Sequence, residues 1–263
     1  MSTIYTLNGK VLKNSANNKW LTKVAVDPYN PLGLPDNTLR IEVTEGATVN
    51  VFNGTSTQIS SSPNVWEISD PNGTQMPYFY LSPSSGHVLK VLGAKRKSGD
   101  ATSDYAWSEV KNHASYITYV GSVDLIGLNI TGVFMNMSNL THIGNVNMPD
   151  QSSFEEMFYL CRSLVEIGQI QMKSGVTSFK SCFQGCNAIT ELPTINLESA
   201  TDVNSFMEGC YLYPHPLTIY NQLSNLGAQI TDNRYCFSNC GRDTVTGAAE
   251  LAQIPSSWGG TGA

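Results

Sequence analysis

The sequence has few charged residues and no long apolar run. Only 14% of its 263 residues are charged, and 21 acidic residues outnumber 15 basic ones. Phosphate binding requires clustered Lys and Arg, and the one basic run, Lys95-Arg96-Lys97, lies beside Gly and Ser in a segment typical of a solvated turn. We therefore expect no nucleic-acid partner. Because no apolar run is long enough to cross a bilayer, we also expect no membrane insertion.

The motifs that commonly mark a catalytic site are also missing. The sequence contains no Gly-x-Ser-x-Gly, no P-loop, no Rossmann glycine pattern and no His-Glu-x-x-His. The four histidines are scattered along the chain. Nothing singles out a pair of carboxylates such as Asp124 and Glu166 for glycosidase chemistry, which needs two acids brought together across a cleft. We expect no enzymatic activity, no catalytic residue and no cofactor.

Cysteine is absent from the N-terminal half, and all six cysteines lie between Cys161 and Cys240. A disulfide framework spreads its cysteines through the whole region that it crosslinks. Here the cysteines recur at two positions of a repeat that elsewhere take Met or Phe, which indicates packing positions. The pattern favours free, stacked thiols. Disulfides remain an alternative, as does a zinc site built from Cys182-x3-Cys186 and Cys236-x3-Cys240, although the repeat accounts for these positions without a metal.

The repeat itself organises the chain from about Val120 to about Cys240. Four similar segments read apolar, Gly or Pro, polar, branched apolar, polar, apolar, and they recur roughly every 24 residues, within the range of leucine-rich repeats: 120–125, 143–148, 167–172 and 192–197. A second set of apolar positions has nearly the same spacing: Phe134, Phe158, Phe183 and Met207. One such repeat does not bury its own apolar face, so successive copies are expected to stack.

Polar residues flank the branched apolar position in each of the four segments. In a strand these flanking side chains point to the face opposite the core, and stacked parallel strands bring them about 4.8 Å apart. We predict a shallow protein- or sugar-binding patch made of Ser122, Asp124, Asn145, Asn147, Gln169, Gln171, Thr194 and Asn196. The alternative is a solvated sheet face whose amides pair with one another.

The N-terminal half has a different pattern, from which we predict three regions. Residues 1–37 form an attachment segment, with a hairpin turn at Asn8-Gly9 and a proline-rich linker or rigid loop from Asp27 to Asn37. Residues 38–116 alternate apolar and polar residues between turn signals, which predicts a small all-β domain and a connector. Residues 117–263 form the repeat region with a C-terminal cap. The fold class is therefore mainly β with short helices, in which an N-terminal β region precedes a C-terminal leucine-rich-repeat solenoid with a parallel sheet.

The repeat resembles the leucine-rich repeats of BspA-type proteins. The matching residues are Met157-Phe158-x-x-Cys161-x-Ser163-Leu164-x-x-Ile167 and the copy that runs from Cys182-Phe183 to Leu192. A shorter N-terminal match, which includes Tyr5 to Leu12, Lys19-Trp20-Leu21 and Pro28 to Leu32, is similar to the start of phage and prophage virion proteins that carry such repeats. Pro193 and the Tyr213-Pro214-His215-Pro216 insertion depart from the repeat pattern.

The resemblance implies a non-enzymatic bacteriophage virion protein, either a tail-fibre or receptor-binding protein or a surface-adhesion component. Its N-terminal region would bind other virion proteins as part of a homo-oligomer, with a trimer as the working hypothesis. The repeats would bind a bacterial surface protein or glycan. The first nine residues lack a basic segment followed by an apolar one, so we expect no signal peptide and a location on the phage particle, extracellular after lysis. Two alternatives are a bacterial cell-surface adhesin and a purely structural capsid or tail decoration protein.

Overall fold

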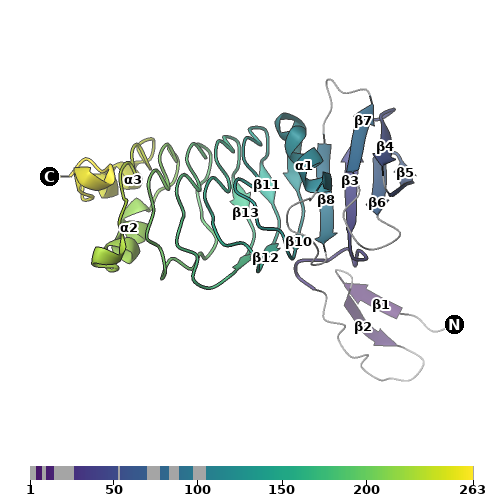
Figure 1. The fold of residues 1–263 in the computed structure, drawn as a ribbon, viewed down its shortest axis with the longest axis horizontal. Helices are drawn as coiled ribbons and strands as arrows, with labels where there is room; N and C mark the ends of the chain where they lie inside the picture. Colours follow the sequence, from purple (N-terminus) through teal and green to yellow (C-terminus); the bar gives the residue numbers. More distant parts are fainter. Residues whose placement is uncertain are drawn as a thin grey trace.

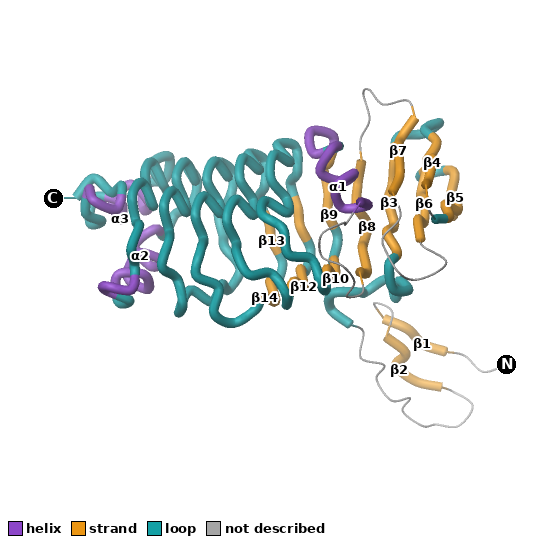
Figure 2. Tube along the Cα trace, in the orientation of Figure 1, coloured by secondary structure: helices purple, strands orange, loops and turns teal. Residues whose placement is uncertain are grey.

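The computed structural model describes residues 4–7, 10–14, 27–52, 54–69, 78–82, 89–96 and 105–262. Within these residues the protein is mainly β, with a mixed sheet that contains parallel strands and with three short α-helices (Figures 1 and 2). The predicted turn at Asn8-Gly9 and the segment Lys19-Trp20-Leu21 lie outside the described residues, as does Lys97. Strands β1 (Ile4–Leu7) and β2 (Lys10–Asn14) form an antiparallel pair of their own.

The main sheet has ten strands and joins the N-terminal strands to the repeats. Strand β3 (Thr38–Val43) is antiparallel to β6 (Asn64–Ser69) on one side and to β8 (Leu89–Arg96) on the other, and β5 (Thr55–Ser61) pairs with β6. Strands β4 (Thr48–Phe52) and β7 (Tyr78–Ser82) form a separate antiparallel pair. Because β8 also pairs in parallel with the first repeat, the sheet continues across residue 116, where the sequence predicts a domain boundary. The division into three domains stays a prediction.

Each of the first three repeats contributes two very short strands separated by a corner. The strands before the corner are β9 (Ile117–Val120), β11 (His142–Ile143) and β13 (Glu166–Ile167), and those after it are β10 (Val123–Leu125), β12 (Val146–Met148) and β14 (Ile170–Met172). Both sets are parallel and in register, so the chain stacks turn upon turn. The turns form an elongated body beside the N-terminal strands (Figure 1).

Glycine occupies the corners because the turns approach too closely there for a side chain. A Cβ atom at Gly121 would lie 2.1 Å from the carbonyl oxygen of Leu92. One at Gly144 would lie 2.6 Å from the backbone nitrogen of Ser122, and one at Gly168 would lie 2.7 Å from the carbonyl carbon of Gly144. The Gly in the repeat pattern is therefore a steric requirement of close stacking.

The core runs along the inside of the turns as a column of Phe and Cys side chains. Phe158 stacks between Phe134 and Phe183, with ring centroids 5.4 and 5.0 Å apart. All six cysteines are free and buried, as the sequence predicts. The Sγ of Cys161 donates to the carbonyl oxygen of Phe134 over 3.0 Å, and Cys186 and Cys210 repeat this contact one and two turns later. Each of these three thiols therefore fills a packing position and satisfies a buried carbonyl.

Helices cover the two ends of the stack. Helix α1 (Tyr105–Asn112) buries Trp107 against Phe134, with ring centroids 5.6 Å apart, and is followed by a 3₁₀ turn, η1 (Ala114–Tyr116). Helix α2 (Pro216–Ser224) begins at the last residue of the Tyr213-Pro214-His215-Pro216 insertion, and the 3₁₀ turn η2 (Gly227–Gln229) follows it. Helix α3 (Val245–Leu251) and the 3₁₀ turn η3 (Ser256–Trp258) end the chain. Trp258 packs edge-on against Tyr220 of α2, with centroids 5.4 Å apart, as expected of a cap.

Candidate functional site

Six of the eight predicted binding residues lie together on consecutive turns. Asp124, Asn147 and Gln171 are in register across β10, β12 and β14. Ser122, Asn145 and Gln169 follow the corner glycines of the same turns. Thr194 and Asn196 lie on the next turn, where the chain forms no strand, but both line the same groove as Gln169 and Gln171.

Asp124 does not face solvent, which corrects the expectation from strand alternation. It is 2% exposed because Lys95, its register partner on β8, covers it with an ion pair. Asn147 Nδ2 donates to Asp124 Oδ1 over 2.9 Å from the other side. Burial works against the charge of Lys95, but the hydrogen bond and the negative charge of Asp124 outweigh it, so the pKa of Lys95 is raised. This part of the polar row therefore joins β8 to the repeats.

The proline-rich segment from Asp27 to Asn37 also lies against the sheet, as a loop that contacts both β8 and the repeats. Asn30 closes the loop on itself, since its Nδ2 donates to Leu34 O and its Oδ1 accepts from Leu34 N, both over 2.9 Å. Leu32 Cδ1 would lie 3.0 Å from a Cβ atom at Gly93 of β8. Asn145 Nδ2 donates to Pro28 O over 3.0 Å. The loop therefore reaches as far as the turn of Asn145.

The hydrogen bonds that join successive corners stop at Pro193. In three successive turns the corner glycine donates to the turn before it: Gly121 N to Val91 O, Gly144 N to Val120 O and Gly168 N to Ile143 O, over 2.7 to 2.9 Å. Pro193 occupies the next corner and has no N–H to donate to Ile167 O. A proline at this place ends the sheet.

Two further series of bonds stop at the same turn. Val123 N donates to Asn145 O and Val146 N to Gln169 O, each over 2.8 Å, but no equivalent bond from Ile170 N to Thr194 O exists within residues 105–262. In the other series, the residue after each corner donates its backbone N–H to the equivalent side chain of the preceding turn. Asn145 N donates to Ser122 Oγ and Gln169 N donates to Asn145 Oδ1, and Gln169 is the last residue of this series. Strand β14 is consequently the last strand of the parallel ladder.

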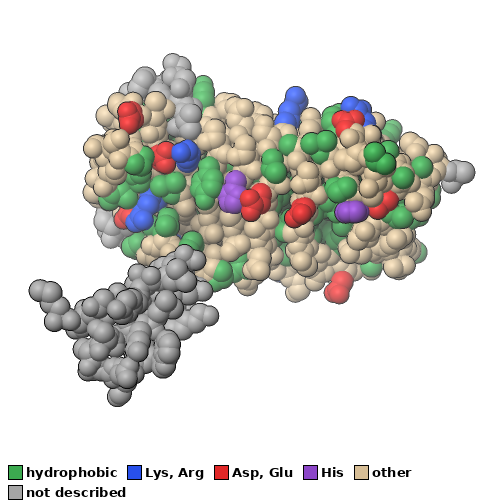
Figure 3. All heavy atoms as spheres, turned by 180° about the vertical axis from the view of Figure 1, so that it is seen from behind, with side chains coloured by type: hydrophobic (Ala, Val, Ile, Leu, Met, Phe, Trp, Pro, Cys, Tyr) green, Lys and Arg blue, Asp and Glu red, His purple; other side chains and the backbone are tan. Residues whose placement is uncertain are grey.

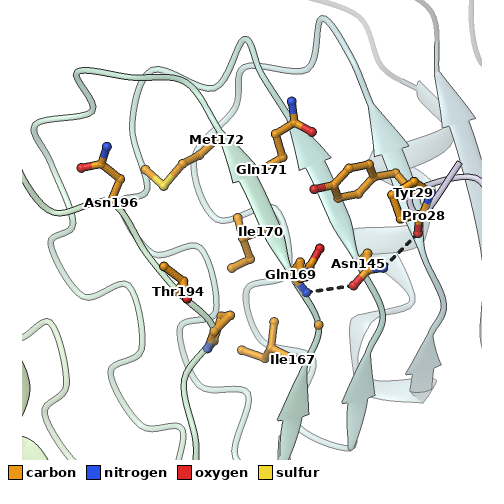
Figure 4. A pocket seen from close by; sticks show the side chains of 12 residues that line it. Pro28, Tyr29, Asn145, Ile167, Gln169, Ile170, Gln171, Met172, Thr194 and Asn196 are labelled. Carbon is orange, nitrogen blue, oxygen red and sulfur yellow. Dashed lines mark hydrogen bonds between the residues drawn. The ribbon is translucent and has the colours of Figure 1, made fainter.

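The opening beside β14 forms a groove of about 920 Å³. Met172 reaches toward Asn196 on one side, and Tyr29 lies over the strands on the other (Figure 4). The lining contains amide, hydroxyl and apolar side chains, and Tyr29 is its one ionisable residue. The residues that line it are Pro28, Tyr29, Asn145, Ile167, Gly168, Gln169, Ile170, Gln171, Met172, Pro193, Thr194 and Asn196.

The groove does not extend to the opposite side of the same turns. On the side of the Phe and Cys column, backbone bonds continue through the same turns, from Phe158 N to Cys182 O, Phe183 N to Phe206 O and Met207 N to Cys236 O, over 2.8 to 2.9 Å. A second hollow of about 460 Å³ lies between residues 194–198 and the end of α2, lined in part by Gln222 and Leu226. The segment from Pro193 to Leu197 is therefore a ridge with a hollow on each side.

Several residues of the groove are not among those predicted from the sequence. Tyr29 lies far from the repeats in the chain, and only the folded structure brings it to Gln171. Ile170 and Met172 belong to positions that the repeat assigns to the core, yet both are partly exposed here. The signal that points to them is Pro193, the one corner that is not glycine. On the face seen from behind, charged side chains are scattered among uncharged ones (Figure 3).

No family model, curated protein or solved structure matches this chain. Among the described residues, no helix is both long and apolar enough to span a bilayer. The same residues contain no group of three or more His, Cys, Asp or Glu side chains placed to hold a metal ion.

Proposed function

We propose that this chain is a non-enzymatic binding protein of a bacteriophage particle, and that its groove beside β14 binds a protein or glycan on the host surface. We further propose that the stacked turns are a leucine-rich-repeat solenoid of the BspA type. The regular backbone bonds between turns and the continuous Phe and Cys column support the solenoid. The motif from Met157 to Ile167 supports the BspA type.

The observation that carries the binding function is the chemistry of the groove lining. Gln169, Gln171 and Asn196 offer amide donors and acceptors beside the partly exposed side chains of Ile170 and Met172. Amides and an aromatic ring such as that of Tyr29 suit sugars and uncharged protein surfaces. Acid–base catalysis would need a titratable group of suitable pKa within reach of the ligand. Binding is the function that this lining favours.

Placement on a phage particle rests on the N-terminal segment. Its resemblance to the start of virion proteins supports attachment to other particle components. Strands β1 and β2 pair with each other and with no other strand among the described residues. A two-stranded sheet is only marginally stable in water, so we expect this hairpin to gain stability from a neighbouring chain, either another virion protein or a second copy within a homo-oligomer.

The placement can be tested with a gold-tagged antibody raised against residues 117–263, applied to intact particles and to bacterial cells. Labelling at the tail tip is expected for a receptor-binding protein. Labelling of the head would indicate a decoration protein. Labelling of bacterial cells without particles would overturn the virion placement and favour the adhesin.

The binding function can be tested by measuring how much purified protein adheres to host cells. The double variant Gln171→Ala, Asn196→Ala removes two amides from the groove and should lower adhesion about tenfold, the effect of losing one or two hydrogen bonds. Gln253→Ala is the matched control, because Gln253 is an exposed amide on the C-terminal cap. Equal adhesion of all three proteins would show that the groove does not bind the host.

A further inference from the structure

The groove exposes a strand edge with unpaired main-chain groups. In a parallel ladder, the N–H and C=O of one residue face one neighbouring strand and those of the next residue face the other. Gln169 O accepts from Val146 N, so it faces β12. The N–H and C=O of Ile170 therefore face the groove, as those of Val146 face β14 one turn earlier. Met172 is two residues further along and has the same orientation as Ile170.

The groups that face the groove are the ones that an additional strand would use. An unpaired strand edge is a template for another extended chain. Within residues 105–262, Ile167 O lacks its donor because Pro193 has no N–H, and Ile170 N lacks the acceptor that Thr194 O would provide. The edge therefore offers both acceptors and donors, spaced as in a strand.

Apolar and polar side chains also alternate along the edge of β14. Ile170 continues the apolar row of Val146, and Gln171 continues the polar row of Asn147. Across the groove, Ile195 is partly buried while Thr194 and Asn196 are exposed. An extended peptide has the same period of two residues, so its apolar side chains would meet Ile170 and its polar ones would meet Gln171. The ring hydroxyls of a sugar do not have this period.

We propose that the edge of β14 binds an extended peptide segment of the host-surface partner, which adds a strand to the sheet between β14 and the turn of Thr194. This inference rests on the proposed function, because it names the class of ligand for the same groove. Strand addition takes its affinity from main-chain hydrogen bonds and its specificity from alternate side chains. The segment should alternate apolar and polar residues and carry no charge, because the lining offers no partner for a buried charge.

The first experiment uses the full chain and two peptide libraries. One contains linear peptides of about eight residues, the length of an ordinary strand, with alternating apolar and neutral polar positions. The other has the same composition in scrambled order, and a glycan array is probed in parallel. We expect binders from the alternating library and none from the scrambled one.

The best binder is then N-methylated at one position at a time. A strand that adds to one edge uses the N–H groups of every second residue, so methylation at those positions should weaken binding about tenfold or more. Methylation at the intervening positions should leave binding unchanged. A loss without this alternation would overturn strand addition.

Two variants of residue 193 give a matched control within the protein. Pro193→Gly restores the N–H of the other corners and lets the ladder close, so it should abolish peptide binding. Pro193→Ala also restores the N–H, but its Cβ would meet the preceding corner, as a Cβ does at Gly144 and Gly168, so the ladder should stay open and the Ile170 N–H should exchange without peptide as it does in the wild type. Amide hydrogen exchange should show the Ile170 N–H protected by the peptide in the wild type and protected without peptide in Pro193→Gly.

The outcomes separate this inference from the proposed function. Binding of glycans alone, with host adhesion still lowered by the Gln171 and Asn196 changes, would overturn the peptide inference and keep the function. Peptide binding that leaves Ile170 N–H exchange unchanged would also overturn it. Host adhesion that does not depend on the groove would overturn the function itself.

Discussion

The side chains of Lys95 and Asp124 form an ion pair that joins β8 to the first repeat strand, β10. Only 19% and 3% of the two side chains is exposed. Asp124 also accepts the hydrogen bond from Asn147 of the next turn. The carboxylates of Asp27 and Asp36 add to the negative potential around Lys95, so the loop of residues 27–37 and the turn of Asp124 both act on one ammonium group. This contact fastens the N-terminal strands to the repeats.

The ion pair predicts a large loss of stability when one partner is removed. Asp124→Ala leaves the ammonium of Lys95 shielded from water without its counter-charge, and we expect the free energy of unfolding to fall by about 3 kcal/mol. Asp243→Ala is the control, because Asp243 and Arg242 form an exposed pair that should contribute about 0.5 kcal/mol or less. Urea unfolding measures both. Similar losses for the two variants would show that the Lys95 pair is no stronger than a surface contact.

A second prediction concerns acid pH and Asp232. The Arg234 guanidinium donates to both oxygens of Asp232, over 3.0 and 2.6 Å, and holds the pKa of that carboxyl well below its usual range. A carboxyl whose pKa is depressed by folding contributes stability above its unfolded pKa, and the contribution is lost as the pH falls through the folded value. Stability should therefore fall on acidification below about pH 4, and less steeply in Arg234→Ala.

NMR titration of the Asp232 carboxyl checks the same prediction directly. In Arg234→Ala its pKa should rise toward the ordinary value of 3.8. Arg242→Ala removes an arginine that pairs with Asp243 instead and should leave the titration of Asp232 as it is. An unchanged titration in Arg234→Ala would show that Arg234 is not the cause of the shift.

The positions of the stacked turns follow from the sequence because their physical causes are local and periodic. Phe158 and Cys161 recur at a fixed spacing because each copy must bury the next, and the period alone identifies them as core. The corner glycines can also be identified from the sequence, because a glycine equivalent to Gly144 recurs at each corner where two backbones approach closely. The sequence likewise predicts free thiols, because a position shared by Cys, Met and Phe is a packing position.

The remaining features depend on contacts between distant parts of the chain. Asn145 and Pro28 are 117 residues apart and meet only after the loop folds back on the sheet. Asp124 is buried because β8 places Lys95 beside it. The sequence indicates a solvated turn at Lys95-Arg96-Lys97, but Lys95 and Arg96 belong to β8 and Arg96 is buried, so that expectation was wrong for these two residues. The groove could be anticipated in part, because Pro193 removes a corner N–H, but the width of the opening depends on how the turns beyond it pack.

The buried cysteines give a third prediction. Burial raises the pKa of the Cys161 thiol to about 12, and it also raises the pKa values of the Cys182 and Cys186 thiols. The folded protein should therefore not react with a thiol reagent at neutral pH, and six thiols should react after denaturation. Above pH 9.0, the ordinary thiol pKa, stability should fall, because the unfolded chain releases protons that the folded chain keeps.

A single exposed cysteine supplies the control for the thiol measurement. Ser174 is exposed at the turn after β14, so Ser174→Cys should react with one equivalent of reagent in the folded state. Reaction of the folded wild-type protein at a comparable rate would contradict the buried positions of its cysteines.

The corner glycines give the last prediction, which compares two alanine substitutions in one sheet. At Gly144 a Cβ would lie 2.6 Å from Ser122 N and 2.7 Å from Gly121 C, both backbone atoms that the ladder holds in place. At Gly93 the nearest atom would be Leu32 Cδ1 at 3.0 Å, the end of a side chain that is 40% exposed and free to move aside. Gly144→Ala should lower the free energy of unfolding by about 2 to 3 kcal/mol, and Gly93→Ala by less than about 1 kcal/mol.

Amide hydrogen exchange shows whether the loss of stability in each of the two variants comes from separation of the backbones. If the backbones are forced apart in Gly144→Ala, the amides of Gly144 and Gly168 should exchange faster, because their bonds to Val120 O and Ile143 O lengthen. In Gly93→Ala the same amides should exchange as in the wild type. Equal costs and equal exchange in the two variants would mean that the corners tolerate a side chain. Alanine at position 193 would then close the ladder as well as glycine, and the contrast between Pro193→Gly and Pro193→Ala would vanish.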